Sequence, residues 1–131
     1  MGELQHANSF RDLVVYQKSR PIAKDIFRLS KSFPKDEAFS LTDQVRRSSR
    51  SVGAQIAEAW GKRPYPRHFI SKLTDADAEQ LETRHWIDIA TDCAYLTPDD
   101  QRKLLDQLSE IGRMLHSMMT KADQFCGMRD D

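Results

Sequence analysis

The chain has 131 residues, which is the usual size of one domain and long enough to bury a single core. Its 20 Lys and Arg side chains balance 20 Asp and Glu side chains, so the overall positive charge of most strong nucleic-acid binders is missing. Two cysteines are too few for a disulfide framework, and no apolar run approaches the roughly 18 residues that span a membrane. These features predict one cytoplasmic domain with reduced thiols and no membrane partner.

The charge is unevenly distributed along the chain. Residues 1–72 hold 14 Lys and Arg against 7 Asp and Glu, whereas residues 73–131 hold 6 against 13. The two halves can face each other within one fold, or one copy's basic surface can meet the next copy's acidic surface in a head-to-tail ring. We favour the arrangement within one fold and keep the ring as the alternative.

The first predicted helix begins at a capping box formed by Ser9 and Asp12 and ends before Phe33-Pro34. Pro21 lies inside it, removes a backbone donor and is expected to kink or loosen its first turns. One apolar stripe, typical of a helix that faces a core, consists of Val15, Ile22, Ile26 and Leu29.

The second predicted helix begins at another capping box, Ser40 to Asp43, and ends at Gly61 before two prolines. The third spans residues 67–94, and the fourth begins at Thr97-Pro98, where an N-cap precedes a proline and two acids. Three core stripes follow the helical period. They are Leu41, Val45, Ser48, Val52, Ile56 and Ala59; Phe69, Leu73, Ala76, Gln80, Thr83, Ile87, Ala90 and Ala94; and Leu104, Leu108, Ile111, Leu115, Met118, Ala122 and Phe125.

Four long helices with short connections and no strand pattern predict an all-α fold, an antiparallel up-down-up-down four-helix bundle. We place the bundle at residues 9–126, with a disordered N-terminal tail at 1–8 and a C-terminal tail at 127–131.

Three arginines, Arg46, Arg47 and Arg50, project from the second helix on the side opposite its core stripe. Gly53 and two alanines, Ala54 and Ala57, continue the same outward side, where small residues allow a second helix to approach closely. The arginines can bind phosphates, but we favour pairing with carboxylates such as Asp43 or Glu82.

Two further charged rows complete the candidate binding residues. On the first helix, spacings of four, four and three align a basic row on one side, and we weigh phosphate contact and a solvated surface equally. On the third helix, three acidic residues and a large aromatic residue share one side, and we expect this acidic strip to pair with the arginines. The rows are Arg20, Lys24, Arg28 and Lys31, and Asp75, Glu79, Glu82 and Trp86. No interleaved aromatic platform accompanies the basic residues.

A second apolar line on the last helix, with one residue every seven positions, indicates either self-association or a wide core stripe. It consists of Leu105, Gly112, Met119 and Cys126. One motif, the Glu-x-x-His of Glu82 and His85, weakly suggests a metal site. A di-iron bundle needs a second such motif and two more inward carboxylates, so we expect no metal, no cofactor and no enzymatic activity.

Three segments, FRDLVVYQKSRPIAKDIF, FPKDEAFSLTDQVRRSSRSVGAQIAEAW and LTDADAEQLETRHWIDIATDCAYL, cover most of residues 10–96. Together they resemble the small four-helix-bundle proteins encoded in intervening sequences of bacterial large-subunit ribosomal RNA genes. The chain departs from that pattern at Pro21 and at Gln55 to Ala59, where many members have Asn-Ile-Ala-Glu-Gly. A structurally similar relative is the accessory variability protein of diversity-generating retroelements, a basic pentamer that associates with nucleic acid.

The resemblance implies a bundle that assembles into a pentameric ring without known enzymatic activity. We therefore predict a homo-oligomeric assembly module that associates with RNA or a nucleoprotein and has no small-molecule substrate. The alternative is a purely structural protein-interaction ring without nucleic acid, and a metal-binding bundle is the remote third hypothesis.

Overall fold

The computed structural model describes residues 7–127. It contains four long helices, α2 (Val14–Ser30), α3 (Leu41–Gly61), α4 (Pro66–Asp92) and α5 (Pro98–Thr120). Three short helices accompany them: η1 (Phe10–Asp12), η2 (Lys35–Glu37) and α6 (Ala122–Cys126). The described part of the chain has no strand. The fold is therefore all-helical, as the sequence predicts.

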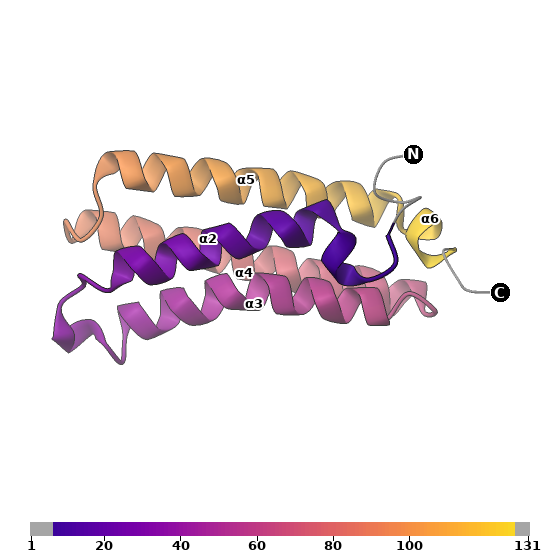
Figure 1. The fold of residues 1–131 in the computed structure, drawn as a ribbon, viewed down its shortest axis with the longest axis horizontal. Helices are drawn as coiled ribbons and strands as arrows, with labels where there is room; N and C mark the ends of the chain where they lie inside the picture. The colour runs from indigo at the N-terminus through magenta and orange to yellow at the C-terminus, as the bar shows by residue number, and fades with distance from the viewer. Residues whose placement is uncertain (1–6, 128–131) are drawn as a thin grey trace.

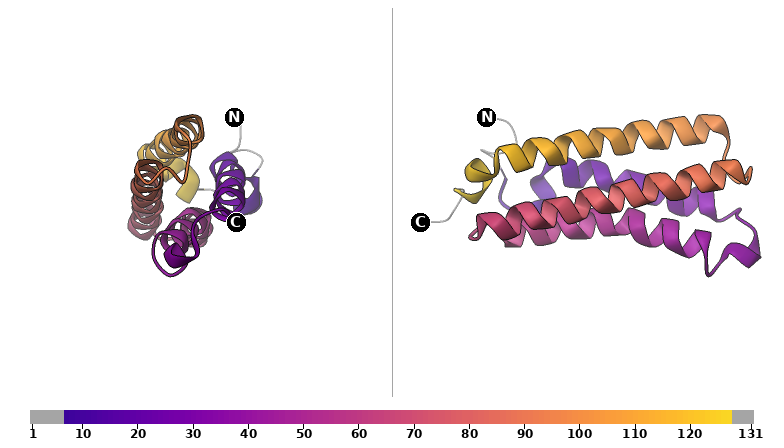
Figure 2. Two further views of the ribbon diagram at one scale, coloured as in Figure 1. Left: turned by 90° about the vertical axis from the view of Figure 1, so that its left-hand side faces the viewer. Right: turned by 180° about the vertical axis from the view of Figure 1, so that it is seen from behind.

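The four long helices lie side by side along one axis (Figure 1). The connections after α2 and α4 lie at one end of the molecule, and the connection after α3 lies at the other. The end-on view shows the helices around a common centre (Figure 2). Helix α2 packs on α3, α3 on α4, α4 on α5 and α5 on α2, with the most extensive contact between α3 and α4.

The core is formed by the stripes that the helical period predicts. Every predicted core position of α3 is buried, and so is every predicted position of α5 and α6. Helix α4 follows its stripe from Phe69 to Ala90. Helix α2 contributes Val15, Ile22 and Ile26, whereas Leu29 is only partly buried. Apolar burial along these stripes is the main stabilising contribution to the fold.

The beginning of the chain's first helix differs from the prediction. The Ser9 hydroxyl accepts the Arg11 N–H and the Asp12 carboxylate accepts the Ser9 N–H, so the capping box forms. It caps the 3₁₀ turn η1 rather than the long helix, because the buried Leu13 is extended and separates the two. Helix α2 then continues through Pro21 to Ser30.

The predicted capping box at Ser40 is wrong in its hydrogen bonding. Ser40 occupies the N-cap position, but its side chain makes no capping bond. Its hydroxyl instead donates to Glu37 Oε1 at 2.7 Å. The Tyr95 hydroxyl donates to the other oxygen of Glu37 at 2.9 Å, and together these bonds lower the pKa of the Glu37 carboxyl. The serine therefore joins α3 to the preceding loop rather than to its own first turn.

Helix α4 ends two residues before the predicted boundary. Ala94 has a φ of 64°, a left-handed conformation that stops the helix, and it is exposed rather than buried. The next residue, Tyr95, donates its backbone N–H to Ala90 O at 2.8 Å. The N-cap at Thr97 forms as predicted and accepts the Asp100 N–H at 3.0 Å.

The tail predictions fall largely on residues outside the described range. Residues 1–6 and 128–131 are not described, whereas Ala7 is buried in the core and Asn8 donates its N–H to Asp12. Within residues 7–127, no helix has both the length and the apolar character needed to cross a bilayer.

Candidate nucleic-acid interface

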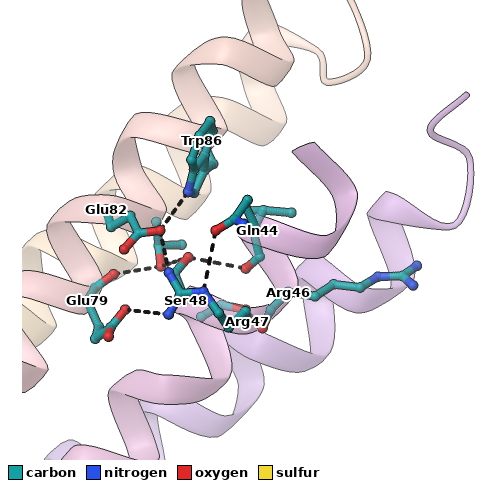
Figure 3. Close-up of polar contacts among 10 residues, drawn as sticks. Gln44, Arg46, Arg47, Ser48, Glu79, Glu82 and Trp86 are labelled. Carbon is teal, nitrogen blue, oxygen red and sulfur yellow. Dashed lines mark hydrogen bonds and ion pairs between the residues drawn. The ribbon is translucent and has the colours of Figure 1, made fainter. Parts of the chain in front are cut away.

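The three arginines of α3 do not form one outward group. Arg47 points towards α4, where it pairs with Glu79 at 3.3 Å and with Glu82. Figure 3 shows Arg46 extending away from this pair of carboxylates. Arg46 and Arg50 both lie against the ring of Phe27 on α2. Adjacent residues on a helix are about 100° apart, so neighbouring arginines reach different helices.

The acidic strip of α4 accepts Arg47 from within the same chain. The Trp86 indole N–H also donates to Glu82, at 2.9 Å (Figure 3). The hydrogen bond from Arg47 is the main reason that the pKa of Glu82 is lowered, and the same bond raises the pKa of Arg47. Farther along the strip, Lys72 lies 3.9 Å from Asp75 and pairs with Glu58 at 2.7 Å. The contact of Arg47 with Glu79 and Glu82 therefore joins the basic half and the acidic half within one fold.

A buried polar contact lies beneath this ion pair. The Thr83 hydroxyl lies 2.8 Å from Ser48 Oγ and 2.8 Å from the Glu79 carbonyl oxygen, and both side chains are fully buried. A satisfied buried hydroxyl pair fixes the rotation of one helix against the other. It thereby fixes which of the three arginines faces α4.

The small residues of α3 have a packing partner within the chain. A Cβ on Gly53 would lie 3.2 Å from Ser19 Oγ and 3.5 Å from the Tyr16 ring. The close-approaching helix is therefore α2. Beside this contact, Ala54 and Ala57 line an open groove of about 340 Å³ between α2 and α3.

The second apolar line, on α5 and α6, faces neighbours within the same chain. Gly112 and Cys126 are buried, and Leu105 and Met119 pack partly buried against the core. A Cβ on Gly112 would lie 3.0 Å from Gln80 Nε2 on α4. This geometry supports a wide core stripe over a self-association surface at these four positions.

The basic row of α2 lies exposed beside Arg46 and Arg50. All four of its members are exposed, and Arg28 pairs with Asp25 of the same helix at 3.7 Å. We call the combined surface the α2/α3 basic face. It consists of Arg20, Lys24, Arg28, Lys31, Arg46 and Arg50.

Phe27 is an aromatic residue of this face that was not among the residues predicted from the sequence. Phe27 is 36% exposed, and the charged ends of Lys31, Arg46 and Arg50 lie within 5.3 Å of its ring centroid. Phe27 adds a single ring under three cations, which is not the interleaved aromatic platform whose absence the sequence indicates. The spacing of four between Phe27 and Lys31 was the available signal, because residues four apart are neighbours on a helix.

The Glu-x-x-His motif does not form a metal centre. Glu82 is held by Arg47 and Trp86, and the exposed His85 lies against the Trp86 ring at 4.8 Å. Across the described range, no group of three or more His, Cys, Asp and Glu is placed to hold a metal ion.

Comparison with known proteins identifies the family. Residues 11–117 match the family model described as 23S rRNA-intervening sequence protein. A crystal structure of a protein with unknown function from the S23 ribosomal protein family of Bacteroides thetaiotaomicron is similar, with a TM-score of 0.74 and 30% sequence identity over 82% of this chain and 96% of that chain. No curated protein matches the chain. The chain belongs to the 23S rRNA-intervening sequence protein family.

Proposed function

We propose that the protein is a non-enzymatic, cytoplasmic, homo-oligomeric bundle that associates with RNA or a nucleoprotein through the α2/α3 basic face. The observation that carries this proposal is the uncompensated charge of that face. Within residues 7–127, Arg28 is the only one of its six cations with a carboxylate in ion-pair distance. Such a surface attracts a polyanion, and binding releases the counterions that had surrounded the polyanion.

The contrast with the rest of the molecule supports this assignment. Arg47 and Lys72 are paired with the acidic residues around them, and Lys18 pairs with Glu110 of α5 at 3.4 Å. The zero net charge of the whole chain therefore hides a local positive surface. Local charge, rather than net charge, determines attraction at distances within the roughly 8 Å Debye length of physiological salt.

We further propose the up-down-up-down bundle as a subunit of a pentameric ring. Two large apolar side chains, Phe39 and Leu81, are 96% and 52% exposed. Contact with a neighbouring subunit would remove these apolar side chains from water, which is favourable. Sedimentation velocity at several protein concentrations should give the mass of five subunits, whereas a single species of one subunit's mass would contradict the ring.

The direct test is a fluorescence anisotropy titration with a 20-nucleotide single-stranded RNA across salt concentrations. We expect the logarithm of affinity to fall linearly with the logarithm of salt, by about 0.7 for each phosphate contact. Changing Arg20, Lys24 and Arg28 to Gln should reduce the slope by about 2 and the affinity about 100-fold at 0.1 M salt. The matched control changes three cations outside the face to Gln: Arg84, Arg102 and Arg113.

The second candidate function is a structural protein-interaction ring, which the exposed Phe39 and Leu81 favour. It predicts oligomers that do not bind the RNA even at low salt. Equal losses in the two triple variants would also reject the basic face as the specific contact.

A further inference from the structure

Three cations from two helices share one aromatic ring on the α2/α3 basic face. The Arg46 guanidinium lies 4.7 Å from the Phe27 centroid, the Lys31 ammonium 4.9 Å and the Arg50 guanidinium 5.3 Å. Lys31 follows Phe27 by four residues at the end of α2, and the two arginines lie one turn apart on α3. We call Phe27, Lys31, Arg46 and Arg50 the Phe27 cluster.

One arginine of the cluster is held in a fixed orientation. Arg46 donates its Nε–H to Ser30 Oγ at 2.7 Å, and the Ser30 hydroxyl in turn donates to the Phe27 carbonyl at 3.1 Å. Ser30 is 2% exposed, so this anchor lies under the surface. The anchor uses only one of the five guanidinium donors, which leaves the terminal N–H groups free to bind an anion.

The cluster brings like charges together without a compensating acid. Throughout the described residues, no carboxylate lies within ion-pair distance of its three cations. The electron-rich face of an aromatic ring attracts each cation and so offsets part of their repulsion. A bound anion would interact favourably with all three charges.

We propose that the Phe27 cluster binds a phosphate group of an RNA backbone, a proposal that rests on the function proposed above. Arg46 and Arg50 hold the phosphate oxygens, because guanidinium groups match phosphate geometry. Lys31 adds a third charge, and Phe27 positions the cations. Phe27 is a positioning residue rather than a phosphate contact.

The surroundings of the cluster favour a linear polyanion over an isolated acidic side chain. Lys31 also ends the basic row that continues through Arg28, Lys24 and Arg20. Residues four apart on a helix are separated by about 6 Å along its axis, so the charges leave the cluster as a regular line. Successive phosphates of one strand can follow this line, whereas a single carboxylate would occupy only one position.

The experiment compares single variants in the titration with the 20-nucleotide RNA. Lys31→Gln, Arg46→Gln and Arg50→Gln should each weaken binding about fivefold at 0.1 M salt and reduce the salt slope by about 0.7. Phe27→Leu keeps every charge and an apolar side chain, and we expect it to weaken binding about twofold or more because the cations lose their shared ring. The control Arg47→Gln removes a charge from the same helix and should leave binding unchanged.

A second readout follows the cluster directly by NMR. The Arg46 Nε–H signal should shift on addition of the RNA, while the Arg47 Nε–H, which points to Gln44, should not. Poly-glutamate of equal charge and inorganic pyrophosphate serve as competitors. If poly-glutamate displaces the RNA equally well, an acidic protein partner replaces our assignment, and displacement by micromolar pyrophosphate would indicate a small-phosphate site instead.

The failures of the two proposals are distinguishable. The cluster assignment is overturned if the wild-type protein binds the RNA and the triple variant of Arg20, Lys24 and Arg28 loses binding, but Lys31→Gln, Arg46→Gln and Arg50→Gln all bind as tightly as the wild type and the Arg46 signal does not move. The proposed function then stands. If the wild-type protein does not bind the RNA at low salt, the proposed function itself fails.

Discussion

Arginines on the two sides of α3 lie in opposite environments, one acidic and one basic. On the side facing α4, Arg47 meets Glu79 and Glu82 above a buried Thr83–Ser48 contact. On the side facing α2, Arg46 and Arg50 meet an aromatic ring and other cations. The role of an arginine on α3 therefore depends on which neighbouring helix its side chain reaches. A run of basic residues in a sequence can therefore divide between stabilising the fold and binding a partner.

The largest expected effect concerns the core that both sides of α3 share. Ile56 is fully buried, so Ile56→Ala should lower the free energy of unfolding by about 2–5 kcal/mol through lost apolar burial and a residual cavity. Urea unfolding at fixed protein concentration measures this. The control Ala54→Ser changes the exposed side of the same helix and should stay within about 0.5 kcal/mol. A cost below about 1 kcal/mol for Ile56→Ala would contradict the packing described here.

A smaller effect is expected at the buried contact that orients the α4 side. Thr83→Val leaves Ser48 without its strongest partner and should cost about 1–3 kcal/mol. The double variant with Ser48→Ala should cost clearly less than the sum of the two single changes, because the polar pair is removed together. Strict additivity in the cycle would show that the two hydroxyls do not interact.

The ion pair itself contributes less, because it lies at the surface. We expect Arg47→Gln to lower the free energy of unfolding by about 0.5–1 kcal/mol, since Glu79 and Glu82 then face each other without a cation. Arg50→Gln should cost almost nothing or stabilise the fold, because it relieves repulsion within the Phe27 cluster. Thermal unfolding of both variants measures their loss of stability. Equal losses would contradict the distinction between the two sides of α3.

The smallest expected effect is a pH dependence of stability at the ion pair that faces α4. The folded-state pKa of Glu82 is lowered below its ordinary value of 4.5, first by the Arg47 hydrogen bond. Its stabilising contribution is therefore present above about pH 4.5 and is lost as the pH falls through the lower folded-state pKa. Glu82→Gln should flatten the stability profile between about pH 5 and 3. An unchanged profile would mean that the pair is not populated in solution.

The sequence predicted the α3 core well, because burial there follows the helical period. Leu41, Val45 and Ile56 are buried as the spacing required. The division of the arginines could not be predicted in the same way, since periodicity gives a residue's angle on its helix but not the positions of the neighbouring helices. Pairing of Arg47 with Glu82 was expected, whereas the contacts of Arg46 and Arg50 with α2 were not.

Helix ends and the candidate site were harder to predict from the sequence than the core. Ser40 fits a capping pattern, but a bond to Glu37 competes for its hydroxyl. Phe27 lies next to the core residue Ile26, and only the position of α3 brings two arginines onto its ring. Both features depend on contacts between segments, which a single helical pattern does not contain.

We propose that phosphate binds on the side of α3 facing α2 and not on the side facing α4. The most direct measurement is the salt-dependent RNA titration of Arg50→Gln beside Arg47→Gln, two variants that remove the same charge three residues apart. We predict about fivefold weaker binding at 0.1 M salt and a salt slope smaller by about 0.7 for Arg50→Gln, with no change for Arg47→Gln. Equal losses in both variants, or a loss confined to Arg47→Gln, would contradict the claim.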